Sequence, residues 1–510
     1  MNPEQQATDK SAPEAGSTGL TDTAVMDKHL LGGLAWTAGA KWASQILTWL
    51  CLLVVARLLE PRDFGVVGVA GVYLGLVAVF SEFGFGSAVV TLRSLTVNDI
   101  AQINTFSVMS GAVGFLVSCA LALPMGRFFR SPELPAVIVV MSTSFLILGF
   151  KTVPSSVLQK DFRFKRLSLI DSSAAITQSL CVLLLAWLGH GYWALALGSV
   201  VGALVGTALN VTSRPCGFAR PRLKSVAHAV NLSWQVLMAR LSWILYSDAD
   251  FLVAGRVLGT TALGAYTFAW NLATLPVEKV TALVGQVTPA FFSANQTDYN
   301  ALRRYLLSLT EAVSLVTFPA TIGLGLVAPE FIGLFLGSRW SDAVAPLEVL
   351  AFYGSIRTVS ALLGPLLTAL RETRFLMWTN VAAAILMPLL FYIGSRWGPV
   401  GIACGWIVGY PLIALPLYRK AFRRVGMSLR NYLVAIRPAL DAGLVMIFAV
   451  VALKWVIPVQ WPLYLRFGIE VVAGAIAYFV VLLVLHIDRL RSFIEFYRRL
   501  RVPNKKAAGG

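Results

Sequence analysis

LVVARLLEPRDFGVVGVA (Leu53–Ala70) closes one apolar run, turns through a short polar segment at Glu60–Asp63 and opens a second apolar run. The same pattern returns as LVAGRVLGTTALGAYTFA at Leu252–Ala269. Each copy carries an Arg, a Gly and an Ala in the same order and at the same spacing. The matching pairs, each 199 positions apart, are Arg57 with Arg256, Gly65 with Gly264, and Ala70 with Ala269.

A second match lies at the other end of each copy. Apolar helices resemble one another by composition, so one match alone has little weight. Two matches in the same order, at opposite ends of a long unit, predict that the chain contains an internal duplication. The second match, 207 positions apart, pairs Gly191, Gly198 and Gly202 with Gly398, Gly405 and Gly409.

The composition indicates an integral membrane protein. Of the 510 residues, 57% are hydrophobic and only 13% are charged, whereas a soluble domain carries about 25% charged residues. The polar residues are too few to cover the surface, so lipid must be part of the solvent. The apolar runs are long and continuous, not alternating, which favours helices over a β-barrel.

A membrane-spanning helix needs about 20 mostly apolar residues. On that criterion we expect an all-α protein with about fourteen transmembrane helices. The segments are 32–56, 64–81, 101–123, 134–153, 168–189, 191–212, 229–254, 261–287, 305–327, 344–369, 376–394, 397–417, 439–457 and 465–486.

The basic residues are distributed unevenly between the two sides of the membrane. If residue 1 is cytoplasmic, most of the 42 Lys and Arg lie in cytoplasmic tails and loops. This positive-inside distribution predicts that both termini are cytoplasmic. The net charge of +17 is therefore expected to set topology and attract anionic lipid headgroups, and not to bind nucleic acid.

The duplication organises these segments into two pseudo-symmetric lobes of six helices with a central cavity between them. Six is an even number, so both lobes start on the same face and form a parallel repeat about an axis along the membrane normal. The expected units are a disordered cytoplasmic tail (1–29), the first lobe (30–212), a basic cytoplasmic linker (213–228), the second lobe (229–418), a second basic cytoplasmic linker (419–438), two additional helices (439–486) and a basic amphipathic tail (487–510).

Signatures of enzymes and cofactor sites are missing from the sequence. It has no G-x-x-x-x-G-K-[ST] loop for nucleotide binding. The five cysteines are scattered without disulfide or metal spacing, and the four histidines lie at segment ends without forming a metal pair. We therefore expect a protein that is not an enzyme and holds no cofactor.

Charges inside apolar segments are the informative candidates for a site, because each costs about 2.5–3.5 kcal/mol at a helix centre. Lys41 and Arg240 are separated by the repeat interval, so they occupy equivalent positions in the first helix of each lobe. They are expected to form a cationic pair across the cavity, or else each is neutralised by an acid of its own lobe. The intramembrane cations are Lys41, Lys151, Arg240, Lys279 and Arg357.

Two acids in the seventh segment are candidates for a second site. Asp248 and Asp250 are two residues apart, about 200° around a helix, so they cannot both face the cavity. One of them is expected to pair with Arg240 or Arg357, and a structural ion pair is favoured over a coupling site for a proton or sodium ion. Lys279 follows a proline bend and is expected to reach the cavity or to snorkel.

Five stretches carry a family resemblance: GLAWTAGAKW, VVARLLEPRDFGVVGVA, SEFGFGSAVV, LQKDFRFKR and DFLVAGRVLGTTALGAYTFAWN. They resemble the Wzx-type polysaccharide flippases of the multidrug/oligosaccharidyl-lipid/polysaccharide exporter superfamily, and within it the branch of colanic acid-type exporters. The resemblance covers about residues 30–486.

The resemblance implies alternating access and a substrate made of undecaprenyl-diphosphate-linked oligosaccharide, moved across the bacterial inner membrane for surface polysaccharide or exopolysaccharide synthesis. Partner polymerases or export machinery are expected from the family. A cation-coupled multidrug exporter and a lipid II flippase remain alternatives. By position and charge, the resemblance implies a cationic cavity formed by Lys41, Arg57, Arg240, Arg256 and Arg357, to which Lys279 is added as a cavity cation.

Overall fold

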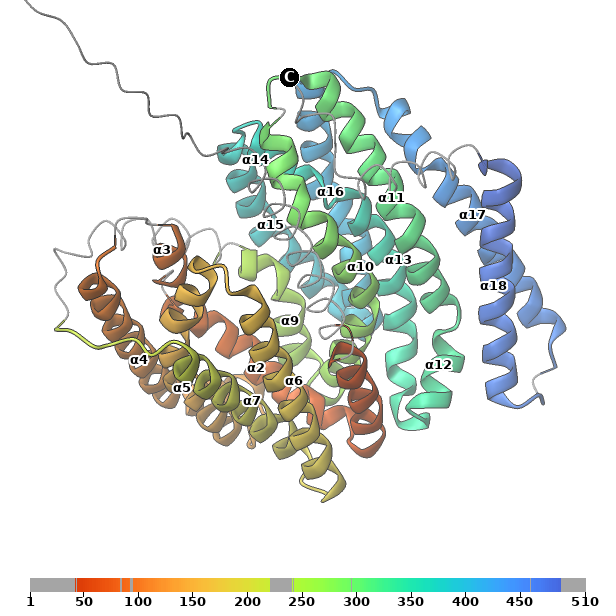
Figure 1. Ribbon diagram of the computed structural model, residues 1–510. Coiled ribbons are helices and arrows are strands. Elements are labelled where there is room, and N and C mark those ends of the chain that lie inside the picture. The colour runs from red at the N-terminus through yellow and green to blue at the C-terminus, as the bar shows by residue number, and fades with distance from the viewer. Residues whose placement is uncertain are drawn as a thin grey trace, which may run out of the picture.

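The computed structural model describes residues 42, 44–82, 85–91, 95–220, 241, 243–294, 296–458 and 460–487, and this part of the chain is helical without strands. Two helical lobes lie side by side, with two further helices at the outer edge of the second lobe (Figure 1). The first lobe contains a first helix at Ser44–Leu58, then α2 (Pro61–Glu82), α3 (Phe85–Thr91), α4 (Val97–Phe129), α5 (Leu134–Lys160), α6 (Phe164–Trp187) and α7 (Tyr192–Ser213).

The second lobe repeats this order of long helices. It contains α9 (Ala249–Val257), α10 (Thr260–Ala294), α11 (Tyr299–Leu326), α12 (Ala328–Phe335), η1 (Ser338–Ala343), α13 (Val344–Ser360), α14 (Leu363–Ala369), α15 (Thr373–Gly394), η2 (Ser395–Trp397) and α16 (Gly398–Val425). The two outer helices are α17 (Leu429–Val456) and α18 (Leu463–Leu485).

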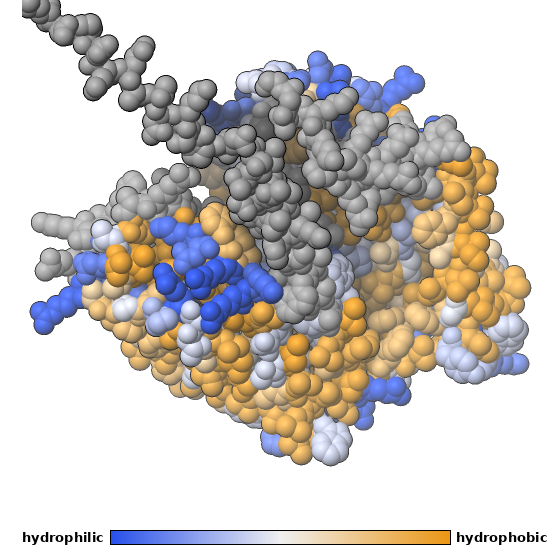
Figure 2. All heavy atoms as spheres, viewed as in Figure 1, coloured by the Kyte–Doolittle hydropathy of each residue, from blue (hydrophilic) through white to orange (hydrophobic). Residues whose placement is uncertain are grey.

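Ten helical stretches of the described chain are long and apolar enough to span a membrane, and hydrophobic residues cover much of the visible face outside the grey atoms (Figure 2). The protein is therefore a multi-pass membrane protein. The expected number of fourteen stays a prediction. One of the ten stretches joins α15 to α16, the first helix is shorter than the others, and α10 is not among the ten.

The duplication predicted from the glycine spacing is confirmed where α2 crosses α10. A Cβ added to Gly65 would lie 1.7 Å from the Thr260 carbonyl oxygen, and one added to Gly264 would lie 1.7 Å from the Pro61 carbonyl oxygen. Each contact is the other's equivalent in the repeat, so a pseudo-two-fold axis passes between the two helices. We call this end of the molecule, at the Leu58–Pro61 turn, the crossing end.

The second set of repeated glycines also packs equivalently in the two lobes. Gly198 and Gly202 of α7 face Val182 and Gln178 of α6. In the other lobe, Gly405 and Gly409 of α16 face Phe391 and Met387 of α15. In both lobes the absence of a side chain lets the fifth and sixth long helices approach closely.

The second linker, predicted over 419–438, is mostly helical, and its cytoplasmic placement stays a prediction. α16 continues to Val425 and α17 begins at Leu429, so nearly all of it is helical. Helical hydrogen bonding does not end where the apolar run ends, and charged residues are stable in a helix that has left the membrane. Arg424 and Lys420 of α16 pair with Glu372, and Ser428 caps α17 through the Asn431 N–H.

The first linker has a different structure. Residues 214–220 are not helical, and α4 holds them through side chains. The Asn104 amide donates to the Gly217 carbonyl at 3.2 Å, and the Thr105 hydroxyl donates to the Ala219 carbonyl at 2.9 Å. The 1–29 tail, the rest of this linker and the amphipathic tail beyond 487 lie outside the described residues.

Candidate functional site

A cavity of about 250 Å³ lies between the lobes, where the first helix faces α10. Four lining residues of the first helix follow helical spacing, and so do those of α10, so each helix presents one face to the cavity. The lining is mixed, with indole rings, amides, hydroxyls and one carboxylate. The lining residues are Gln45, Thr48, Trp49, Leu52, Phe268, Trp270, Asn271, Leu272, Thr274, Leu275 and Glu278.

Lys279 is the predicted cation that the structure places beside this cavity. Its Nζ donates to Gln45 Oε1 at 2.9 Å and lies 5.8 Å from the centre of the Trp49 ring. Within the described residues, Lys279 has no carboxylate at ion-pair distance. Neutral partners hold the ammonium in place without cancelling its charge, which leaves it able to attract an anion.

Arg357, on α13, lies behind the cavity wall. It is half-buried and within electrostatic reach of the hydroxyls of Tyr246, Tyr353 and Tyr410. Tyr353 stacks on Trp270, one of the two indoles that line the cavity. Arg357 therefore belongs to the aromatic layer beneath the cavity, and in the part of the chain that the structure describes it forms no ion pair.

Two of the predicted cations, Arg57 and Arg256, are not brought together with Lys279. Arg57 is exposed at the crossing end, and Arg256 lies over the Phe128 ring with 5.1 Å between guanidinium and ring centre. Neither side chain lines the cavity. Lys41 and Arg240 lie outside the described residues, so the cationic pair across the cavity stays a prediction.

Asp250 is completely buried and bound by uncharged donors. It accepts from the Tyr266 hydroxyl at 2.7 Å, from Trp406 Nε1 at 2.9 Å and from the Phe251 N–H at 2.9 Å. An ion pair with Arg357 is not present. The carboxylate instead joins α9, α10 and α16, while Asp248 is half-buried at the helix break that precedes α9.

Trp340 closes the crossing end, and the sequence analysis did not identify it. This residue of η1 is fully buried in the second lobe, and its Nε1 donates to the Ala56 carbonyl of the first lobe at 2.7 Å. Its ring packs against Phe64 and Phe268, with centroids 5.2 and 4.7 Å away. The only sequence signal was a tryptophan inside a short polar connection, which does not specify a partner.

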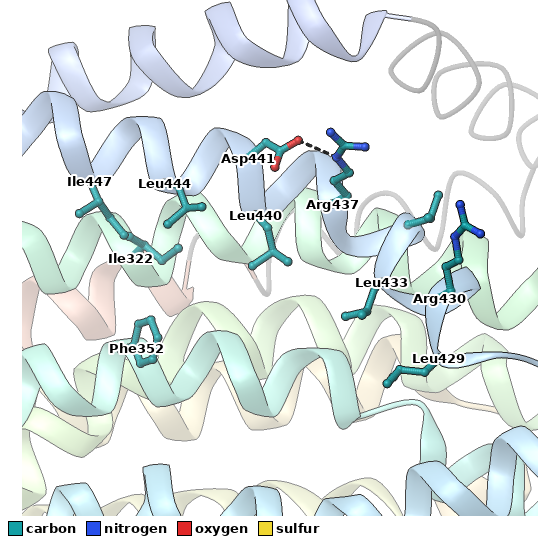
Figure 3. A pocket seen from close by; sticks show the side chains of 11 residues that line it. Ile322, Phe352, Leu429, Arg430, Leu433, Arg437, Leu440, Asp441, Leu444 and Ile447 are labelled. Carbon is teal, nitrogen blue, oxygen red and sulfur yellow. Dashed lines mark hydrogen bonds and ion pairs between the residues drawn. The ribbon is translucent and has the colours of Figure 1, made fainter.

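A second hollow, of about 700 Å³, lies between α17 and the α11–α13 side of the second lobe. Its walls are mostly aliphatic side chains such as Leu440 and Leu444, and its charged residues gather toward one end, where Arg437 pairs with Asp441 (Figure 3). An apolar chain with a polar head would match this distribution.

The two outer helices are attached to the second lobe by half-buried cations that pair with buried carboxylates. Lys454 of α17 and Arg466 of α18 both pair with Glu330 of α12, at 2.7 and 3.2 Å. Lys454 also lies 3.5 Å from Glu470, which is completely buried. Because separating these charges inside the protein is costly, α17 and α18 are expected to move with the second lobe as one body.

Comparison with known proteins agrees with this architecture. The profile of a family described as "Polysaccharide biosynthesis protein" matches residues 54–345. The lipopolysaccharide biosynthesis protein WzxC of Escherichia coli (strain K12) is 26% identical over 78% of this chain and 83% of its own length. The succinoglycan biosynthesis transport protein ExoT of Rhizobium meliloti (strain 1021) is 24% identical over 94% and 98%.

Among solved structures, the lipid II flippase MurJ in an inward closed conformation superposes with a TM-score of 0.75. The alignment covers 89% of this chain and all of that one, at 15% identity. This likeness shows a shared fold. Because the family profile matches more than half of this chain, the chain belongs to the polysaccharide biosynthesis protein family.

Proposed function

We propose that this protein is a flippase that moves undecaprenyl-diphosphate-linked oligosaccharide repeat units across the bacterial inner membrane by alternating access. Its product would supply the synthesis of surface polysaccharide or exopolysaccharide. The family supports this role, since relatives are named as proteins of polysaccharide biosynthesis and transport.

One observation carries the proposal to this chain: Lys279 lies beside the cavity between the lobes and has only neutral partners among the described residues. A diphosphate must cross a medium that disfavours charge, and a fixed cation in a hydrated cavity lowers that barrier. Arg357 is the second described cation on this side of the second lobe. The second hollow, between α17 and the α11–α13 side of the second lobe, offers a place for the polyprenyl chain while the diphosphate head crosses the membrane.

The crossing end faces the periplasm in this proposal, and both termini face the cytoplasm. The lobes are packed together at the crossing end, so the conformation described corresponds to a state loaded from the cytoplasmic side. Rocking of the lobes would then separate the Gly65–Gly264 contact and open the crossing end. A proton or sodium gradient drives the cycle, with Asp248 and Asp250 as the candidate coupling acids, and a polymerase is the expected downstream partner.

Two related functions compete with this one. A cation-coupled drug exporter would use acids exposed to the cavity. Glu278 is one such acid, but Lys279 beside it has only neutral partners among the described residues, and the Asp250 carboxylate is buried among three donors. A lipid II flippase has the same headgroup chemistry, and the likeness to MurJ keeps it as the closer alternative.

The test is to delete the gene in its native bacterium and complement it with Lys279→Ala or with wild type. We expect deletion to abolish surface polymer and to trap the lipid-linked repeat unit on the cytoplasmic leaflet. Lys279→Ala should restore membrane insertion but little export. Intact polymer with altered drug resistance would favour the exporter, and a defect in peptidoglycan would favour lipid II.

A further inference from the structure

The cavity between the lobes has the chemistry of a carbohydrate site. Carbohydrate rings offer an apolar face, which stacks on aromatic rings, and a rim of hydroxyls, which needs fixed hydrogen-bond partners. Trp49 and Trp270 supply rings from the two lobes, while Asn271 and Glu278 lie two turns apart on α10. Neither the Asn271 amide nor the Glu278 carboxylate has a side-chain partner within the described residues, so both are available to a ligand.

Trp270 is held rigidly from behind. Its ring lies 5.8 Å from Phe251, 6.1 Å from Tyr353 and 5.2 Å from Trp406, measured between ring centroids. Trp406 is in turn hydrogen-bonded to the buried Asp250. Because the wall is already ordered, a ligand that stacks on it loses less conformational entropy on binding.

The position of Lys279 sets the orientation of a ligand in the cavity. Lys279 lies nine positions after Trp270 on α10, which corresponds to about 13 Å at 1.5 Å per residue. A diphosphate bound by Lys279 would therefore place the first attached sugar between this lysine and the Trp270 end of the cavity. The cavity, at about 250 Å³, suits a single pyranose ring and not a whole oligosaccharide.

Glu278 gives the cavity a charge preference. An exposed carboxylate accepts hydrogen bonds from hydroxyl or amino groups of a sugar, but it repels the carboxylate of a uronic acid. Resting on the proposed function, we infer that this cavity is the subsite for the sugar next to the diphosphate, and that it takes an uncharged or amino-bearing pyranose in preference to a uronic acid.

The test uses the full chain in lipid nanodiscs and three probes: undecaprenyl diphosphate, the same lipid carrying galactose, and the same lipid carrying galacturonate. We expect wild type to bind the galactose lipid about tenfold more tightly than the bare diphosphate, the scale of one aromatic stacking contact. It should bind the galacturonate lipid no more tightly than the bare diphosphate.

Four variants separate the roles. Trp270→Leu and Asn271→Ala should lose the tenfold advantage of galactose and leave bare diphosphate binding unchanged. Glu278→Gln should tighten galacturonate binding, and Lys279→Ala should weaken all three probes. Trp187→Leu, an exposed indole at the end of α6, is the matched control. Asn271 is exposed, so its variant retains the fold even if Trp270→Leu does not.

Two results would overturn the subsite while leaving the flippase intact. In one, wild type binds the galactose lipid and the bare diphosphate equally. In the other, Trp270→Leu and Asn271→Ala behave like Trp187→Leu. Failure of wild type to bind any of the three lipids would instead overturn the proposed function, and the subsite with it.

Discussion

Adding a methyl group at Gly65 should force the lobes apart at the crossing end. The new Cβ would lie 1.7 Å from the Thr260 carbonyl oxygen, whereas ordinary contact begins at 3.4 Å, so the helices must separate by roughly 1.7 Å. The obstructing atoms are backbone and cannot rotate away. Overpacking of this kind costs about 1–3 kcal/mol, which changes the ratio of closed to opened crossing ends about 5- to 150-fold.

The assay is a distance measurement between spin labels at positions 60 and 261, which are exposed on opposite lobes near the crossing, in a background without the five native cysteines. Gly65→Ala should shift the distance distribution to longer values and slow export. Gly71→Ala is the matched control, because it lies on the same helix and its Cβ would meet no atom within 4 Å. That control should be neutral or stabilising by up to about 1 kcal/mol. Identical distributions for the two variants would refute the reasoning.

Three further predictions concern hydrogen bonds and charge. Trp340→Phe keeps an aromatic ring in place but removes the hydrogen bond to the Ala56 carbonyl. The free energy of unfolding should therefore fall by about 1 kcal/mol, and the crossing end should open more readily. A melting temperature equal to that of wild type would contradict this. Asp250→Asn keeps an acceptor for its donors and should fold, whereas Asp250→Ala leaves buried donors unpaired, at about 1–3 kcal/mol each; equal thermal stability of the two variants would argue against the assigned bonds. The hydrogen bond from Arg424 lowers the pKa of Glu372 in the turn before α15. The stabilisation from this pair is therefore fully present at a pH above the usual pKa of a glutamate, and it is lost as the pH falls through the lowered pKa. The melting temperature of Glu372→Gln, measured against pH, should lack that acid-dependent loss.

Much of the architecture could be read from the sequence, because the relevant quantities are local. Whether a segment enters a membrane depends on the summed transfer free energy of about 20 consecutive residues, so the long apolar runs marked the helices. The 199-residue spacing between Gly65 and Gly264 likewise identified the repeat. Helix ends were less predictable, as α16 and α17 show, because hydrogen bonding continues into charged residues beyond the apolar run.

The site could be predicted only in part. Lys279 was recognised as an intramembrane charge, but nothing local indicated that Gln45, 234 positions away, holds it. Asp250 was recognised in the same way, yet the expected partner was a cation and the observed partners are Tyr266 and Trp406. A charge within an apolar run signals that it needs a partner, not which partner it has.

The sequence by itself determined that this chain is a duplicated bundle of membrane helices. The transfer free energy of a segment is a sum over consecutive residues, and the repeat spacing is a difference between residue numbers, so both can be read along the chain. Only the tertiary structure decided which helix faces meet: that Gly65 touches the backbone of α10, that Trp340 closes the crossing end against Ala56, and that Trp49 and Trp270 line one cavity. The rotation of each helix about its axis is set by packing against residues distant in the chain. The cavity therefore exists only where those rotations bring two faces together.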